Sequence, residues 1–412
     1  MIIELISIGD ELLKGAIVNT NAAFLSRRLR QAGYSVARQT ILPDENNALS
    51  VGFREALHRA DLIVATGGLG PTLDDRTREI VAELFHSDFH LDQAIADQIK
   101  RRFGKVSVQI ENQATVPSKA KPFPNRIGTA PGLVFSENGK TVILMPGVPK
   151  EMEPMFLEDI LPWMQRQFPI QDKKESAQLF FCLVHESLVD PHLRTLSQRY
   201  PAVEAGIYPA HGTLSVSLHS SDKDQLEAFQ KELTQQFNPY LYLAKSGKIE
   251  EALQDWFVKH KKTLAFAESC TGGLLSSHVT SVPGASEYFL GSLVVYSNSM
   301  KEEILGVSKK TLDSQGAVSE ETVQEMLEGV FQRSAADFAI AVSGIAGPTG
   351  GTEQKPVGTI CAAIGQRGKS PDIGTFQSFG NRQTITLSTT HKLLGALWRK
   401  VEKGIPAFPL LP

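Results

Sequence analysis

Residues 267–273, Ala-Glu-Ser-Cys-Thr-Gly-Gly, join an apolar run at 263–267 to a helical pattern that begins at Leu274 and continues through His278 and Val279. An apolar run followed by glycines predicts a buried strand, a tight turn and a helix. This arrangement sets Ser269 on the turn, beside glycine amides that can approach a ligand closely. Such geometry is typical of a nucleophile that faces an oxyanion site.

A lysine completes this candidate site. Lys301 follows Tyr296-Ser297-Asn298, where the next predicted strand ends and another helix opens. Parallel α/β sheets gather their ligands at the carboxyl ends of neighbouring strands, so we expect Ser269 and Lys301 to meet there. A serine hydroxyl needs a base to take its proton, and lysine serves as one where burial or a neighbouring cation favours its neutral form. The pattern predicts a Ser/Lys pair for amide hydrolysis.

Simpler interpretations of the same residues stay open at this point. Ser269 is also a suitable helix N-cap, because serine accepts hydrogen bonds from the first turn of a helix. Lys301 is also compatible with a solvated position at a helix start. Cys270 is a rival nucleophile, since a thiol is intrinsically more reactive than a hydroxyl.

Length and composition set the class of protein. The chain has 412 residues, 42% hydrophobic and 21% charged, with a net charge of −3, so we expect a globular protein of two or three domains. The small charge gives no reason to expect nucleic acid or an anionic membrane as a partner. Three scattered cysteines, Cys182, Cys270 and Cys361, indicate neither a disulfide framework nor a zinc module. No apolar run has the length of a membrane span, and we expect a cytoplasmic location.

Strands and helices alternate in two of the three predicted domains, residues 1–169 and 248–405, which indicates an α/β class with mostly parallel sheets. The middle domain, 172–244, reads as strand, helix, strand, helix, strand. Asn138-Gly139 between two apolar runs predicts a β-hairpin. Expected strands lie at 2–8, 61–66, 132–135, 141–145, 179–184, 214–218, 240–243, 337–342 and 357–364, with a terminal helix from Asn381 to about Val401.

A glycine-rich loop at 343–359 is expected to line a small-molecule pocket with its backbone amides. It contains neither a Walker A motif nor a dinucleotide-binding GxGxxG pattern, and a tight crossover loop is the alternative. Arg382 follows a predicted N-cap, where an arginine suits a bound phosphate, although a surface salt bridge explains it equally well. The expected contacts in the loop are Gly344, Gly347, Gly350, Gly351 and Thr352.

The first domain carries a separate set of glycines and acidic residues after its strands. Its glycines are expected to cradle a phosphate, and Asp74 and Asp75 to hold a divalent cation against it. Adjacent aspartates that open a helix are also ordinary dipole-favoured residues. His86 and His90 are expected to be surface residues and not metal ligands. The candidate nucleotide-binding residues are Asp10, Glu11, Asn21, Thr66, Gly67, Gly68, Gly70, Pro71 and Thr72.

Together these motifs resemble the CinA family of competence/damage-inducible proteins across essentially the whole chain. The first domain resembles the molybdopterin-binding fold through 9–15, 17–21, 66–75 and 145–152, and the middle domain resembles a KH-like α+β module. The last domain is similar to bacterial nicotinamide mononucleotide deamidases through 267–273, 296–298 with Lys301, and 344–359. The middle domain lacks a GXXG loop, so RNA binding does not carry over.

The resemblance implies that the last domain converts nicotinamide mononucleotide to nicotinic acid mononucleotide and ammonia without a cofactor. Ser269 is then the nucleophile and Lys301 the general base. Thr271 with the amides of Gly272 and Gly273 is expected to stabilise the oxyanion, and Arg382 to bind the substrate phosphate. Tyr296 and Asn298 are expected to orient the lysine or the substrate.

For the first domain the resemblance implies metal-dependent ADP-ribose pyrophosphatase activity. A divalent metal of unknown identity is expected on Glu11, Asp74 and Asp75, in an arrangement unlike that of Nudix enzymes. Both activities suit pyridine-nucleotide recycling, and the family suggests a homodimer. Two alternatives remain: a non-enzymatic regulator of competence or DNA damage, and an N-terminal pterin- or nucleotide-binding module without turnover.

Overall fold

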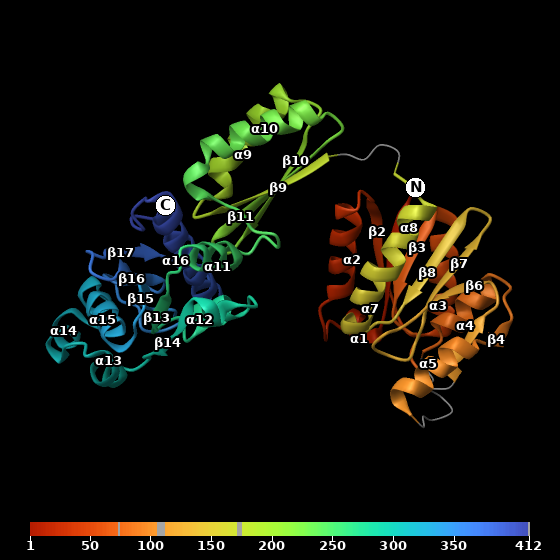
Figure 1. Ribbon diagram of the computed structural model, residues 1–412, viewed down its shortest axis with the longest axis horizontal. Helices are drawn as coiled ribbons and strands as arrows, with labels where there is room; N and C mark the ends of the chain where they lie inside the picture. The colour runs from red at the N-terminus through yellow and green to blue at the C-terminus, as the bar shows by residue number, and fades with distance from the viewer. Residues whose placement is uncertain (73–74, 105–111, 171–174, 411–412) are drawn as a thin grey trace. The chain divides into compact units, whose positions relative to one another are not determined.

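A computed structural model describes residues 1–72, 75–104, 112–170 and 175–410. Asp74, one of the expected metal ligands, lies outside these residues. The chain forms two compact units, Met1–Lys173 and Lys174–Pro412 (Figure 1). The second unit contains both the middle domain and the last domain predicted from the sequence.

The first unit is built on a six-stranded sheet in the order β2-β1-β3-β8-β7-β6. The strands β2, β1, β3 and β8 run parallel, and β7 and β6 add antiparallel pairs at one edge. Asn138 and Gly139 both have positive φ, which confirms the predicted hairpin turn between β7 and β8. The strands are β1 (Ile3–Ile8), β2 (Val36–Leu42), β3 (Leu62–Thr66), β6 (Ala120–Phe123), β7 (Gly132–Glu137) and β8 (Lys140–Met145).

Helices pack on both faces of this sheet and form two separate apolar cores (Figure 1). One face carries α2 (Thr20–Gln31), α7 (Pro149–Met155) and α8 (Leu161–Gln167), with the π-helical turn Phe156–Ile160 between the last two. The other face carries α3 (Asn46–Arg59), α4 (Thr77–Leu84) and α5 (Gln93–Phe103). The remaining pieces are α1 (Asp10–Leu13), a 3-10 turn (Asn112–Ala114) and the small pair of strands β4 (Phe89–Leu91) and β5 (Thr115–Pro117).

The second unit begins with a four-stranded antiparallel sheet in the order β10-β11-β9-β12. The sequence predicted three strands here, and β10 was missed. This strand lies at the sheet edge, is largely exposed and includes Pro209, so it lacks the alternating apolar pattern of a half-buried strand. The elements of this four-stranded sheet and its helices are β9 (Glu175–Cys182), α9 (Glu186–Arg199), β10 (Glu204–Ala210), β11 (Thr213–Ser220), α10 (Lys223–Gln236), a 3-10 turn (Asn238–Tyr240) and β12 (Leu241–Tyr242).

A five-stranded sheet in the order β14-β13-β15-β16-β17 forms the rest of the second unit. Its strands are β13 (Leu264–Glu268), β14 (Phe289–Val294), β15 (Phe338–Gly344), β16 (Thr359–Gln366) and β17 (Asp372–Gln377). Strands β14, β13 and β15 run parallel, whereas β16 and β17 are antiparallel. The sequence analysis missed β17, which is another partly exposed edge strand.

Side chains alternate along β13 and point into two separate apolar cores. Leu264 and Phe266 pack with α11 (Ile249–Lys259), α12 (Leu274–Thr280) and α16 (Arg382–Lys403). Ala265 and Ala267 pack on the opposite face. That face carries α13 (Asn298–Leu305), α14 (Lys309–Gln315) and α15 (Glu320–Arg333), and the turn Ala285–Glu287 precedes β14.

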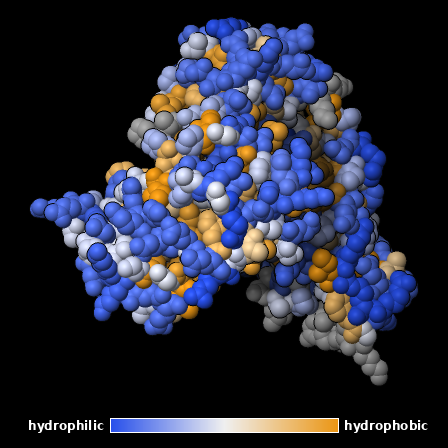
Figure 2. Space-filling model, turned by 60° about the vertical axis from the view of Figure 1, so that its left-hand side comes forward, coloured by the Kyte–Doolittle hydropathy of each residue, from blue (hydrophilic) through white to orange (hydrophobic). Residues whose placement is uncertain are grey.

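These sheets and their helical layers confirm the predicted α/β class. Figure 2 shows a face of the molecule on which hydrophilic residues predominate and apolar residues are scattered. Among the helices of the described residues, none is both long and apolar enough to cross a membrane.

Candidate active site

Ser269 lies on a sharp turn between β13 and α12, as the sequence predicts. Its backbone amide donates to the carbonyl of Val342 at 3.0 Å, which anchors the turn to the neighbouring strand β15. The turn then uses positive φ at Gly272 (60°) and Gly273 (97°), a conformation in which a β-carbon is strained. Gly273 is the N-cap residue of α12, so Ser269 does not cap this helix.

Lys301 reaches Ser269 from α13. Its side chain is only 1% exposed, and its Nζ lies 3.0 Å from the Ser269 Oγ. The same Nζ contacts the carbonyl oxygens of Val295 at 3.0 Å and Tyr296 at 3.1 Å. Burial lowers the pKa of Lys301. A neutral amine can donate its two N–H groups to the carbonyls and turn its lone pair towards the serine hydroxyl.

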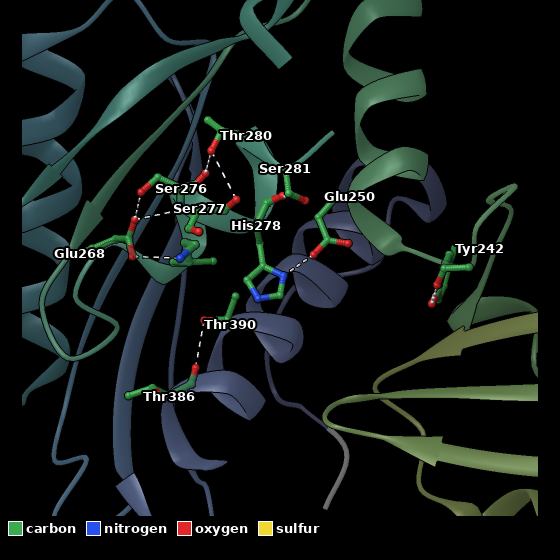
Figure 3. Close-up of polar contacts among 12 residues, drawn as sticks. Tyr242, Glu250, Glu268, Ser276, Ser277, His278, Thr280, Ser281, Thr386 and Thr390 are labelled. Carbon is green, nitrogen blue, oxygen red and sulfur yellow. Dashed lines mark hydrogen bonds and ion pairs between the residues drawn. The ribbon is translucent and has the colours of Figure 1, made fainter. Parts of the chain in front are cut away.

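The Glu268 carboxylate fixes the shape of this turn through hydrogen bonds. Its carboxylate is fully buried and accepts six hydrogen bonds, three on each oxygen. Three of the donors are backbone amides in and just before the first turn of α12, where a negative charge also complements the helix dipole (Figure 3). The donors are the Thr271 hydroxyl, the amides of Gly273 and Leu275, both the amide and hydroxyl of Ser276, and the Ser292 hydroxyl.

These contacts occupy donors that the sequence analysis assigned to the oxyanion. The Thr271 hydroxyl and the Gly273 amide donate to Glu268, and the Gly272 amide donates to the Ser269 carbonyl at 3.1 Å. The sequence did not reveal this role of Glu268. The available signal was an acidic residue at the end of an apolar strand, directly before a helix.

Cys270 is buried in the apolar core that also contains Phe266 and Leu275. Its side chain is 6% exposed, and burial raises the pKa of its thiol to about 12. A β-carbon on Gly344 would lie 3.1 Å from the Cys270 sulfur, so the sulfur packs against the end of β15. The thiolate required for nucleophilic attack is therefore disfavoured at neutral pH.

For the amide hydrolysis expected from the sequence, replacing Cys270 with alanine should leave turnover within about threefold of the wild type, because a buried, protonated thiol is a poor nucleophile. Ser269→Ala in the same assay is expected to abolish turnover. Steady-state ammonia release measures both. If Cys270→Ala is as inactive as Ser269→Ala while its circular dichroism spectrum is unchanged, Cys270 takes part in the reaction.

Arg382 joins three segments that are distant in the sequence. It occupies the first turn of α16, whose N-cap Asn381 accepts from the amide of Thr384 as predicted. Its guanidinium donates to the carbonyl of Gly347 at 2.8 Å and to the hydroxyl of Tyr296 at 2.6 Å. No carboxylate of the described residues pairs with it, so the salt-bridge alternative is not what the structure contains. Arg382, Tyr296 and the glycine-rich loop thus lie together.

The glycine-rich loop connects β15 to the antiparallel strand β16. Its ends are joined by hydrogen bonds from the Ile345 amide to the Thr359 carbonyl and from the Gly358 amide to the Ile345 carbonyl. Gly347 and Gly350 have positive φ, and a β-carbon on Gly351 would lie 2.7 Å from the Val357 nitrogen. Thr352 closes an exposed turn with Lys355, and Asn298 is exposed at the start of α13.

The first unit has a pocket of about 580 Å³ at the carboxyl ends of β1, β3 and β8. Six of the nine predicted nucleotide-binding residues line it: Glu11, Asn21, Thr66, Gly68, Gly70 and Pro71. Asn21 donates to the Gly147 carbonyl at 2.7 Å, while its own side-chain oxygen is buried without a partner among the described residues. The sequence did not identify Glu151, another carboxylate in the lining.

The other three predicted residues have structural contacts. Asp10 pairs with Lys14, Gly67 donates its amide to the Met145 carbonyl, and Thr72 donates to the Asp75 carboxylate. Glu11 and Asp75 both line the pocket. His86 and His90 are exposed, which confirms their predicted surface location.

Comparison with known proteins places the chain in a family. Residues 246–401 match the family described as "CinA C-terminal domain", and residues 4–166 match the one described as "Probable molybdopterin binding domain". A CinA-like protein of Thermotoga maritima is 39% identical over 363 residues, which cover 86% of this chain and 88% of that protein. The chain belongs to the CinA family.

Another CinA-like protein, from Fervidobacterium nodosum, is 37% identical and covers 94% of this chain and 95% of its own length. Among solved structures, the protein CinA "with unknown function" from Thermoplasma acidophilum is 40% identical, with a TM-score of 0.37. The match covers 40% of this chain and 96% of that one. The family matches and the CinA-like relatives confirm the predicted membership of the CinA family. Residues 175–245 fall between the two matched segments, and their KH-like character stays a prediction.

Proposed function

We propose that the second unit is a Ser/Lys amidohydrolase that removes the carboxamide nitrogen of nicotinamide mononucleotide. The observation that carries this proposal is the buried Lys301 amine at 3.0 Å from the Ser269 hydroxyl, with its pKa lowered by burial. Incubating the full chain with the mononucleotide should release ammonia and nicotinic acid mononucleotide in equal amounts. If the wild-type chain releases neither, the proposal fails.

The reaction follows from this pair. As the Ser269 oxygen attacks the amide carbon, neutral Lys301 takes the hydroxyl proton. The tetrahedral intermediate then breaks its carbon–nitrogen bond, and the Lys301 ammonium gives its proton to the departing nitrogen, which leaves as ammonia. Water next attacks the ester on Ser269, again losing a proton to Lys301. The acid product leaves, and the serine oxygen recovers its proton.

The oxyanion donors are assigned to the amides that directly follow the nucleophile. Neither the Cys270 amide nor the Thr271 amide donates to a backbone carbonyl among the described residues. An amide next to the nucleophile is a recurring oxyanion donor on strand-to-helix turns. Glu268 supports these amides indirectly, because it fixes the turn that carries them.

Arg382 is the proposed phosphate ligand, held in place by Gly347 and Tyr296. Arg382→Ala is expected to raise KM for nicotinamide mononucleotide by about 10- to 100-fold, as for the loss of a charged hydrogen bond. The same variant should hydrolyse nicotinamide riboside, which has no phosphate, as well as the wild type does. Equal losses on the two substrates would contradict a phosphate-binding role.

The pH dependence of kcat/KM should reflect the protonation state of Lys301. Lys301 must be neutral in the free enzyme, so kcat/KM is expected to fall as the pH drops through its lowered pKa and to level off above it. The Cys270 thiol, with a pKa of about 12, stays protonated throughout this range. The profile is measured as initial ammonia release in a constant-ionic-strength buffer series. Activity that rises towards acid pH would contradict a neutral amine as the base.

For the first unit, we propose metal-dependent hydrolysis of ADP-ribose. The supporting observation is the pocket of about 580 Å³, which is lined by the glycines after β3 and by the carboxylates of Glu11, Asp75 and Glu151. Mg²⁺ and similar ions are held by one or two carboxylates together with substrate phosphates, so this donor set fits such an ion. A bound cation would neutralise charge on the pyrophosphate, and the chain's own glycines and Asn21 would position the nucleotide.

The two units can be tested within one protein. The full chain should release AMP from ADP-ribose when a divalent cation is added, and Asp75→Asn should lower this activity while leaving ammonia release unchanged. Binding of ADP-ribose without hydrolysis under Mg²⁺, Mn²⁺, Co²⁺ and Ni²⁺ would instead favour a nucleotide-binding module. Loss of both activities in Asp75→Asn would indicate a general folding defect.

A further inference from the structure

Three side chains outside the Ser269–Lys301 site converge on one point of the second unit. Glu250 comes from α11, His278 from α12 and His391 from α16, and their potential ligand atoms all lie within 4.8 Å of one another. The Nδ1 of His278 lies 2.6 Å from the Glu250 carboxylate, and Figure 3 shows these two side chains reaching towards each other. The rings of His278 and His391 meet edge to face at 4.8 Å between centroids.

This cluster contains a buried polar atom that lacks a hydrogen-bond partner among the described residues. The Nδ1 of His391 is buried without a hydrogen-bond partner among the described residues, and such an atom carries a desolvation cost. Glu250 is 3% exposed, and its ion-pair partner among the described residues is His278. All three residues line a pocket of about 270 Å³, which is large enough for an ion and water molecules.

We propose that Glu250, His278 and His391 bind a divalent transition-metal ion of the zinc class. Two imidazole nitrogens and one carboxylate oxygen are the ligands that Zn²⁺, Co²⁺ and Ni²⁺ prefer, whereas Mg²⁺ and Ca²⁺ favour all-oxygen sites. A tetrahedral ion with bonds of about 2 Å places its ligands about 3.3 Å apart, so modest side-chain rotations bring the three groups to the ion. The pocket leaves a fourth position for water.

The protonation of the cluster supports this assignment. Burial lowers the pKa of His391, which favours the neutral ring that a metal requires. Burial raises the pKa of Glu250, but the hydrogen bond that it accepts from His278 helps to keep its pKa below the ordinary value. The carboxylate is thus available as an anionic ligand.

The site would join three helices that pack on one face of the sheet. Leu253 of α11, Leu275 of α12 and Leu393 of α16 belong to the same apolar core, so the ion would link elements that are already in contact. The helix α12 begins directly after the turn that carries Ser269. Metal binding is therefore expected to stabilise the second unit in addition to occupying the pocket.

Zinc uptake by the full chain tests the proposal. Protein stripped with a chelator is equilibrated with Zn²⁺ buffered by a competing chelator, and the bound metal is measured by elemental analysis. The wild type should bind zinc with an affinity at least about 100-fold higher than Glu250→Gln, His278→Gln or His391→Gln, since even loss of a residue that only supports a ligand costs 10- to 100-fold. Zinc should also raise the unfolding temperature of the wild type and not that of these variants.

A matched control locates the site. His58→Gln removes an exposed histidine of the first unit, so it should keep the wild-type zinc affinity. In the wild type, zinc should protect His278 and His391, but not His58, from diethylpyrocarbonate modification mapped by mass spectrometry. This footprint does not depend on any variant folding. No zinc uptake by the wild type, or modification of His278 and His391 unaffected by zinc, would overturn the proposal.

Discussion

Lys301→Met is expected to lower kcat for ammonia release from nicotinamide mononucleotide by about 10³-fold or more, the upper part of the range for losing a positioned general base. Methionine fills a similar buried volume but cannot accept the proton of the Ser269 hydroxyl. In the native protein, the oxygen of this hydroxyl lies 3.0 Å from the lysine nitrogen. Because the lysine does not contact the expected phosphate ligand Arg382, KM should change much less than kcat. Steady-state kinetics on the purified full chain measure both constants.

Two further variants show whether the lysine acts as a base or only as a charge. Lys301→Arg keeps a cation that stays protonated, so it should be as inactive as Lys301→Met if a neutral amine is required. Lys392 is a second lysine whose pKa is lowered by burial, but it donates to the Gln377 carbonyl and not to Ser269. Lys392→Met should therefore retain most of the turnover. An active Lys301→Met or Lys301→Arg protein would show that Lys301 is not the general base.

Glu268→Gln is expected to destabilise the second unit by about 2–4 kcal/mol, because the new amide group would face donors that now have an acceptor. Each carboxylate oxygen of Glu268 accepts three hydrogen bonds, and each oxygen receives at least one from a backbone amide. Whichever way the glutamine side chain is oriented, its NH₂ meets at least one of these amides. Amidase activity should fall as well, because the turn that holds Ser269 loses its fixed shape.

Urea denaturation followed by tryptophan fluorescence measures the loss, since Trp256 and Trp398 both lie in the second unit. Hydrogen exchange should increase in the segment from β13 to α12 before it increases elsewhere in this sheet. Glu303→Gln, an exposed glutamate on α13, is the matched control and should change the stability by less than about 0.5 kcal/mol. An unchanged denaturation midpoint for Glu268→Gln would show that the six contacts contribute little.

Local sequence signals determined much of this protein. The strand–turn–helix around Ser269, the Asn138-Gly139 hairpin and the Asn381 N-cap depend on contacts within a few residues, so composition and spacing were enough to predict them. The edge strands β10 and β17 were missed because exposed edges need little apolar alternation. Each is placed by backbone pairing with the strand next to it in sequence, β11 for β10 and β16 for β17.

Tertiary structure alone decided how the side chains are used. Thr271 and Gly273 follow the nucleophile in sequence, yet the fold directs their donors to Glu268. Glu250, His278 and His391 are separated by 28 residues or more and show no common motif, but three helices on one face of a sheet bring them together. Sequence spacing fixes the direction of a side chain within one element, whereas a contact between elements depends on how they pack, which no local pattern records.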